Sequence, residues 1–85
     1  MGFTLKIITP EKLFFEGEVD SLKAPGLDGL FGVLKDHANM VAGLGEGILT
    51  TQSSGKNLDF KVSGGFVEVN DNVVAVIADS AEAID

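Results

Sequence analysis

Apolar and polar residues alternate along most of this chain with a period of two. The clearest apolar rows are Phe3, Leu5 and Ile7; Leu58, Phe60 and Val62; and Val67 and Val69 on either side of Glu68. A period of two is that of a β-strand with one buried face. The pattern therefore predicts strands in these three places, and further strands over 13–15, 18–24, 30–34, 48–52 and 73–78. The last of these is apolar on both faces, which is typical of a central strand.

Turn-forming residues separate the predicted strands. They lie at 9–11, 25–26, 43–47, 53–57, 64–65 and 70–72, and most are Gly, Pro, Asn, Asp or Ser. Such residues tolerate positive φ or bond their own backbone, as tight hairpins require. Eight to ten short strands at this spacing predict an all-β fold, an antiparallel β-sandwich or flattened barrel. Only 36–44 and 79–85 have helical potential.

The size and charge of the chain limit what it can do. Its 85 residues carry a formal charge of −7 and no cysteine, so we expect a single domain over residues 1–85. The acidic balance disfavours nucleic acid and direct docking on anionic lipid. No apolar run approaches the roughly 20 residues of a membrane span, so direct membrane insertion is not expected. The lack of cysteine fits a reducing compartment.

No residue cluster indicates an enzyme, a metal site or a cofactor site. His37 has no second histidine or clustered carboxylate at ligand spacing. The segment 43–47 lacks the spacing of a phosphate-binding loop and places Glu46 where a phosphate would sit. The carboxylate pairs Glu16/Glu18 and Asp20/Asp28 are equally well explained by a solvated strand face. We therefore expect a protein without catalytic residues, metal or cofactor.

Large apolar side chains stand where the chain should turn. Leu27, Leu30 and Phe31 lie in a stretch with glycines at 26, 29 and 32, and more apolar residues follow within 38–44. In one interpretation they close one end of the core. In the other they form exposed patches that bind other proteins. The residue pattern leaves both open.

Long strings of the sequence resemble the epsilon subunit of F-type ATP synthases. The matching strings are ITPEKLFFEGEVDSLKAPGLDGLFGVLKDHA at 8–38, EGIL at 46–49, SGGFVEV at 63–69 and VAVIADSAEAID at 74–85. The resemblance implies a ten-stranded β-sandwich domain. It also implies a non-catalytic rotor subunit of the central stalk that links gamma to the c-ring and couples proton or sodium translocation to ATP synthesis.

The same resemblance implies that the chain lies on the cytoplasmic side of the bacterial cell membrane, attached to it through the ATP synthase complex. It also implies two contact surfaces. The c-ring surface is Leu27, Asp28, Gly29, Leu30 and Phe31. The gamma surface is Thr9, His37, Ala42 and Ile48. Family members usually carry an acidic residue where this chain has Leu30, so a more apolar ring contact is expected here. The sequence stops before the family's C-terminal helical hairpin, so neither ATP binding nor a block of rotation is expected of it.

A different class of function is also consistent with a short acidic all-β chain. Lipoyl- and biotinyl-carrier domains present a modified lysine at a hairpin tip, and Lys56 in SSGKN has such a position. The residues expected around a carrier lysine are absent. A small β-sandwich adaptor with an unknown partner is the third alternative.

Overall fold

The computed structural model describes residues 2–84, and these form β-strands joined by turns and short connections. The eight strands among them are β1 (Phe3–Ile8), β2 (Leu13–Val19), β3 (Ser21–Gly26), β4 (Gly29–Leu34), β5 (Met40–Gly43), β6 (Gly47–Ser53), β7 (Lys56–Asn70) and β8 (Val73–Ile84). The all-β prediction is confirmed. The count of ten strands is wrong, since eight strands are present in the described chain.

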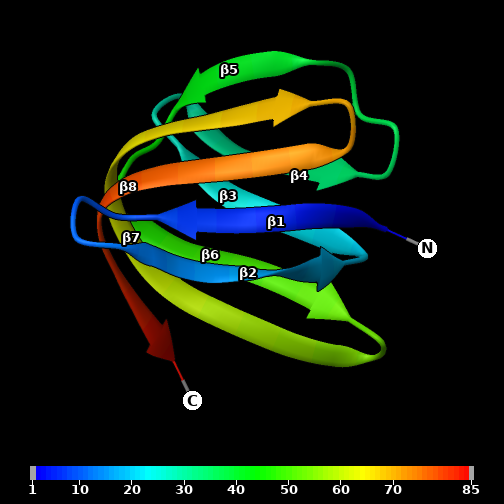
Figure 1. Cartoon of the computed structure of the whole chain (residues 1–85). Coiled ribbons are helices and arrows are strands. Elements are labelled where there is room, and N and C mark those ends of the chain that lie inside the picture. Colours follow the sequence, from blue (N-terminus) through cyan, green and yellow to red (C-terminus); the bar gives the residue numbers. More distant parts are fainter. Residues whose placement is uncertain (1, 85) are drawn as a thin grey trace.

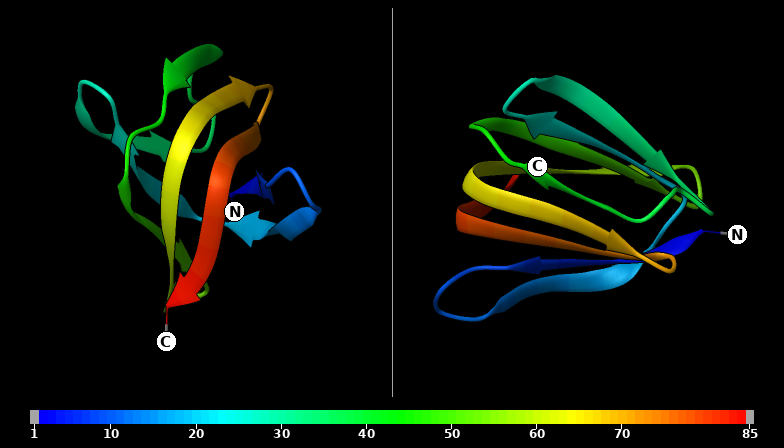
Figure 2. Two further views of the ribbon diagram at one scale, coloured as in Figure 1. Left: turned by 90° about the vertical axis from the view of Figure 1, so that its left-hand side faces the viewer. Right: turned by 90° about the horizontal axis from the view of Figure 1, so that it is seen from above.

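The strand count differs because β7 and β8 each belong to both layers of the fold (Figure 1). The first part of β7 pairs with β6, and its last part pairs with β5. The start of β8 pairs with β1, while its end continues along the first part of β7. The sheet order β2-β1-β8-β7-β6-β3-β4, with β5 beside β7, is therefore one sheet folded over on itself. Figure 2 shows the two resulting layers from the side and from above.

One strand pair departs from the predicted antiparallel arrangement. β1 and β8 run parallel, with Thr4 opposite Val73 and Ile8 opposite Ile77. Both strands place alternate apolar side chains in the core, where Leu5, Ile7, Val74 and Val76 are fully buried. The parallel pair therefore forms the centre of one layer.

Two adjacent glycines in β7 allow the sheet to bend from one layer into the other. Gly64 and Gly65 have φ of +67° and +103°. A β-carbon on Gly65 would collide with the carbonyl oxygen of Ile77 on β8, and one on Gly64 would collide with the Asp79 carboxylate. Glycine has neither the steric penalty at positive φ nor the colliding atom. The bend leaves the β7–β8 register unbroken, so the two strands turn together.

The core lies between the layers and is formed by both. Its sixteen buried apolar residues come from seven of the strands and from Leu44. The ring of Phe60 meets those of Phe14 and Phe15 on β2, with centroids 6.1 and 5.1 Å apart. These rings pack β2 against the opposite layer at one side of the sandwich.

Neither predicted helical segment is a helix. Within 36–44, the backbone of Asp36 is left-handed at φ 65°, and Met40–Gly43 forms β5 against β7. Residues 79–84 continue β8 along β7, and Asp85 lies outside the described residues. In both places, pairing with a strand distant in sequence overrides the local preference. The strand predicted over 18–24 is in fact divided at Asp20 between β2 and β3.

Candidate functional site

The hairpin of β3 and β4 presents large apolar side chains to solvent. Its two-residue turn is Leu27 and Asp28, since Gly26 pairs with Gly29. Leu27 is 72% exposed and Leu30 is 74% exposed, while Phe31 is half-buried. Asp28 and Gly29 are exposed as well. The five residues predicted for the c-ring surface are thus contiguous and form the tip of one hairpin, with only Phe31 reaching toward the core.

This hairpin tip is held in place by the end of β5 and by the segment that joins β5 to β6. The Leu27 amide donates to the Gly43 carbonyl at 3.1 Å, and the Gly45 amide donates to the Pro25 carbonyl at 2.8 Å. The Leu27 side chain lies directly on Gly43, where a β-carbon would be 3.1 Å from Leu27 Cγ. Pro25 lies on Gly47 in a similar way, where a β-carbon would be 2.9 Å from Pro25 Cβ. The glycines of 43–47 therefore let the hairpin rest on their backbone, a role that the sequence pattern did not suggest.

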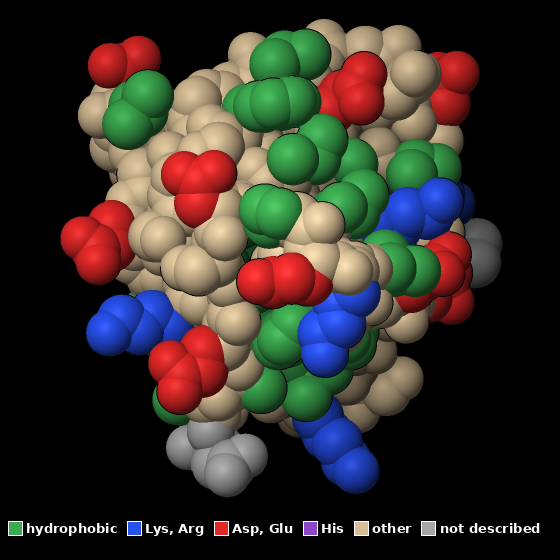
Figure 3. All heavy atoms as spheres, turned by 60° about the vertical axis from the view of Figure 1, so that its left-hand side comes forward, with side chains coloured by type: hydrophobic (Ala, Val, Ile, Leu, Met, Phe, Trp, Pro, Cys, Tyr) green, Lys and Arg blue, Asp and Glu red, His purple; other side chains and the backbone are tan. Residues whose placement is uncertain are grey.

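A groove of about 410 Å³ separates the hairpin tip from β5. Gly26–Phe31 and Met40–Gly43 line it, and Asp28 is the one charged residue among them. Val41 on β5 is 67% exposed and extends the apolar surface. Ala42, predicted for the gamma surface, lines this same groove. Figure 3, which brings the left side of Figure 1 forward, shows a separate band of hydrophobic side chains down the middle of that face, with both acidic and basic groups around it.

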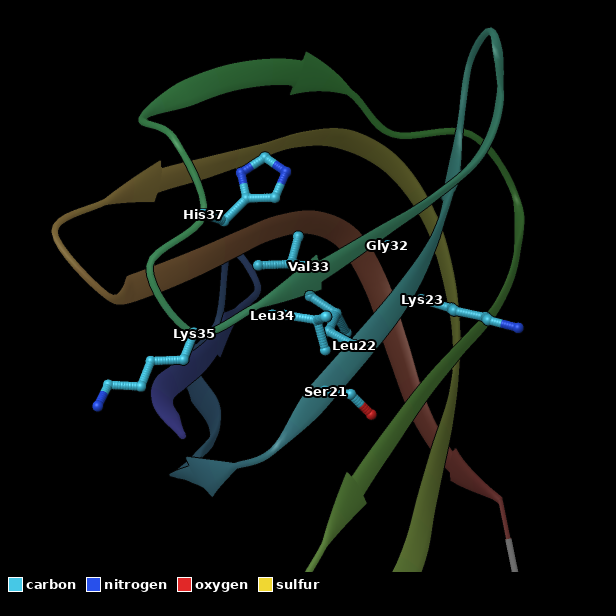
Figure 4. Close-up of a pocket in the computed structure, with 8 residues that line it drawn as sticks. All are labelled: Ser21, Leu22, Lys23, Gly32, Val33, Leu34, Lys35 and His37. Carbon is cyan, nitrogen blue, oxygen red and sulfur yellow. The ribbon is translucent and has the colours of Figure 1, made fainter. Parts of the chain in front are cut away.

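A second hollow, of about 390 Å³, lies along β3 and β4 beyond the tip (Figure 4). Ser21, Leu22, Lys23, Gly32, Val33, Leu34, Lys35 and His37 line it. His37 is half-buried, and its Nδ1 donates to the Ala38 carbonyl at 2.8 Å, because a carbonyl oxygen only accepts. This bond leaves Nε2 as the ring nitrogen available to a partner.

The structure does not gather the four residues predicted for the gamma surface into one patch. Thr9 lies in the turn between β1 and β2, is only 8% exposed, and donates its hydroxyl to the Lys12 carbonyl at 3.3 Å. His37 lies in the connection from β4 to β5, at the opposite end of the sandwich in Figure 1. Ile48 is 44% exposed near the start of β6. His37 lines the hollow along β3 and β4 and Ile48 belongs to β6, which pairs with β3, whereas Ala42 lies on β5.

Within residues 2–84, no group of three or more His, Cys, Asp or Glu side chains is arranged to hold a metal ion. No helix in that same range has the length and apolar character that crossing a membrane requires. Lys56, the residue that a carrier domain would modify, stands directly after the turn of Ser54 and Gly55 and is exposed.

Comparison with known proteins adds a family to this geometry. The model of the ATP synthase, delta/epsilon chain, beta-sandwich domain matches residues 2–84. The ATP synthase epsilon chain of Leptospira borgpetersenii serovar Hardjo-bovis is 47% identical over 75 residues, which cover 88% of this chain and 59% of that protein. That of Chlorobaculum tepidum is 47% identical over 79 residues, covering 92% of this chain and 90% of that protein. The chain thus spans well under two thirds of the Leptospira protein.

Solved structures agree in fold. A chain of the Euglena gracilis mitochondrial ATP synthase, in a structure of its OSCP, F1 and c-ring, superposes with a TM-score of 0.90 at 29% identity. The match covers 99% of this chain and 56% of that one. A chain from the central stalk and c-ring of the Tetrahymena thermophila mitochondrial ATP synthase superposes with a TM-score of 0.76 at 19% identity. The match covers 92% of this chain and 63% of the Tetrahymena chain, and it shows a shared fold. These matches do not favour a lipoyl or biotinyl carrier.

Proposed function

Because its residues 2–84 match the beta-sandwich domain of the delta/epsilon chain, the chain belongs to this family of ATP synthase subunits, and we propose that it is a rotor subunit of the central stalk. In this role it links gamma to the c-ring and couples proton or sodium translocation to ATP synthesis. It contributes binding surfaces and no catalytic group. It is held at the cytoplasmic side of the bacterial cell membrane through its partners.

The observation that carries this proposal is the exposed apolar hairpin tip. Leu27 and Leu30 are among the most exposed large apolar residues of the described chain, and the Leu27 amide in this turn is hydrogen-bonded to the end of β5. A fixed apolar protrusion is costly in water and is typical of a protein-binding surface. We assign Leu27, Asp28, Gly29, Leu30 and Phe31 to the c-ring contact. Ala42 and Val41 extend the same groove.

The contact with gamma is proposed for the outer face of the layer that β4, β3 and β6 form. His37 lines the hollow along β3 and β4, and Ile48 is exposed on β6, which pairs with β3. Thr9 offers little surface because its side chain closes the β1–β2 turn. His37 and Ile48 are therefore the better candidates of the four predicted residues.

Placing a carboxylate at the hairpin tip tests the c-ring assignment. Leu30→Asp should weaken attachment to the membrane sector by about tenfold or more, because burying an unpaired carboxylate costs about 1 to 3 kcal/mol. Leu13→Asp is the matched control, since Leu13 is 51% exposed on β2 and belongs to neither surface. The readouts are ATP-driven ion pumping in reconstituted vesicles and the melting temperature of the free chain. Full pumping with the Leu30→Asp chain would contradict the assignment.

A further inference from the structure

We propose that the hollow along β3 and β4 is a socket for one apolar side chain that gamma presents between acidic residues. This inference depends on the proposed function and makes it more specific, because one binding site on this chain replaces the scattered set of residues predicted to contact gamma. Lys23, Gly32, Leu34 and Lys35 then become contact residues beside His37.

The hollow exists because a side chain is missing from an outward-facing row. Gly32 on β4 stands opposite Lys23 on β3, and the neighbouring pair on the same face is Ser21 with Leu34. A β-carbon on Gly32 would have only the Leu22 carbonyl oxygen near it, at 3.7 Å, so the space above this glycine is open. Leu34 is 63% exposed and supplies an apolar wall.

The charges around the hollow are opposite in sign to the rest of the molecule. The chain has a net charge of −7 and only six basic residues apart from His37. Two of those six, Lys23 and Lys35, line this hollow together with His37. Figure 4 shows the two lysines at opposite ends, with their amino groups pointing outward, and Leu22 and Leu34 between them. An apolar side chain flanked by carboxylates complements this arrangement.

The rim of the hollow is fixed before any partner arrives. The His37 amide donates to the Leu34 carbonyl at 3.1 Å, which closes the turn after β4. The next contact along the turn is between Asp36 and Asn72, where the Asp36 amide donates to Asn72 Oδ1 at 2.7 Å and Asn72 Nδ2 donates to Asp36 Oδ1 at 3.0 Å. A preformed rim reduces the ordering cost of binding.

The hollow also continues into a surface that already holds a proposed gamma residue. Lys23 on β3 pairs with Thr50 on β6, so the two side chains share the outer face of this layer. Ile48 stands two residues before Thr50 and faces the same way. An outer face running across β4, β3 and β6 thus holds the hollow at one side and Ile48 at the other.

Two kinds of substitution test the socket. Gly32→Val fills the hollow with a β-branched residue in a strand, and Lys23→Glu with Lys35→Glu reverses the charges at its ends. The measurement is the dissociation constant of each purified chain for gamma by calorimetry, at low and high salt, with retention on c-rings and the melting temperature measured in parallel. The double variant Lys12→Glu with Lys56→Glu is the control, because it makes the same charge change at two exposed lysines outside the hollow.

Gly32→Val and the Lys23/Lys35 reversal should each weaken gamma binding by tenfold or more and leave c-ring retention and the melting temperature near those of the wild type. The control should bind gamma within about twofold of the wild type. Unchanged gamma affinity in both socket variants, with the wild type binding, would overturn the socket and leave the proposed function standing. Failure of the wild-type chain to bind gamma would overturn both.

Discussion

Asn72 shows how much of this fold one polar residue can organise. It lies in the turn between β7 and β8 with φ of 64°, and its carbonyl accepts from the Thr4 amide of β1 at 3.0 Å. Its side chain bonds the amide and the carboxylate of Asp36, which also has positive φ. Asn72 therefore connects β1, the turn after β4 and the β7–β8 turn.

Two substitutions distinguish the contribution of the Asn72 side-chain hydrogen bonds from that of its left-handed backbone. Asn72→Gly keeps the left-handed backbone and loses the side-chain bonds, which should cost about 1 to 2 kcal/mol of unfolding free energy. Asn72→Ala loses the bonds and adds the left-handed penalty of about 1 kcal/mol or more, so it should be the less stable of the two. Urea denaturation of both chains checks the order. Equal stability of the Ala variant and the wild type would show that this contact contributes nothing.

At single positions, the sequence identified unusual residues but left their exposure and their contacts open. The apolar residues in the 24–32 stretch exceeded what a turn needs, and it is the structure that shows Leu27 and Leu30 exposed and Phe31 half-buried. The role of Gly43 was hidden, because it depends on Leu27, sixteen residues away in the chain and adjacent only in the fold. The same limit applies to the proposed gamma residues, since nothing in the spacing of Thr9 and His37 shows that they lie at opposite ends of the sandwich.

At the scale of the strands, the bend in β7 and β8 controls how the layers meet. Strand content was predictable from the period of two, since each half of β7 has its own alternating row on either side of Gly64 and Gly65. Continuity through the bend was not predictable, because a pair of glycines is equally typical of a turn that ends a strand. The local pattern therefore predicted two short strands, one on each side of the glycines, where the single long strand β7 forms.

A methyl group at the bend should be among the most damaging small changes in the chain. Gly65→Ala combines positive φ with a collision against the Ile77 carbonyl, whereas Gly55→Ala has positive φ and open space. The Gly55 variant should lose about 1 kcal/mol through backbone strain alone, and the Gly65 variant clearly more. Thermal melts should then show a drop of about 4 to 8 °C for each kcal/mol lost. Equal drops would mean that the backbone moves aside at no cost.

At the scale of the whole molecule, the shared strands predict one cooperative unit. Every residue pair between β7 and β8 from Asp59–Ile84 to Asn70–Val73 belongs to one register, and this ladder enters both layers. Unfolding either layer alone would require breaking that ladder or exposing the common core. A single transition is therefore expected.

Two tryptophan reporters test whether the two layers unfold in one cooperative transition. Phe14 on β2 and Phe31 on β4 are both half-buried and pack against the core from strands at the two ends of the sheet order. Phe14→Trp and Phe31→Trp, in separate chains, should each give a urea midpoint that coincides with that of the circular dichroism signal of the same chain. A fluorescence midpoint that departs from the circular dichroism midpoint in either chain would mean that the layers unfold independently.

The hairpin of β3 and β4 carries the apolar tip at one end and the basic hollow toward the other. On the proposed function, torque between the ring and the shaft passes along these two strands, over about 20 Å at about 3.3 Å per residue. The elastic compliance of the coupling then depends on the hydrogen-bonded ladder and on the Leu27–Gly43 support, and much less on the packing of the interior. Substitutions that soften the interior should lower the melting point while leaving the torsional stiffness of the rotor nearly unchanged.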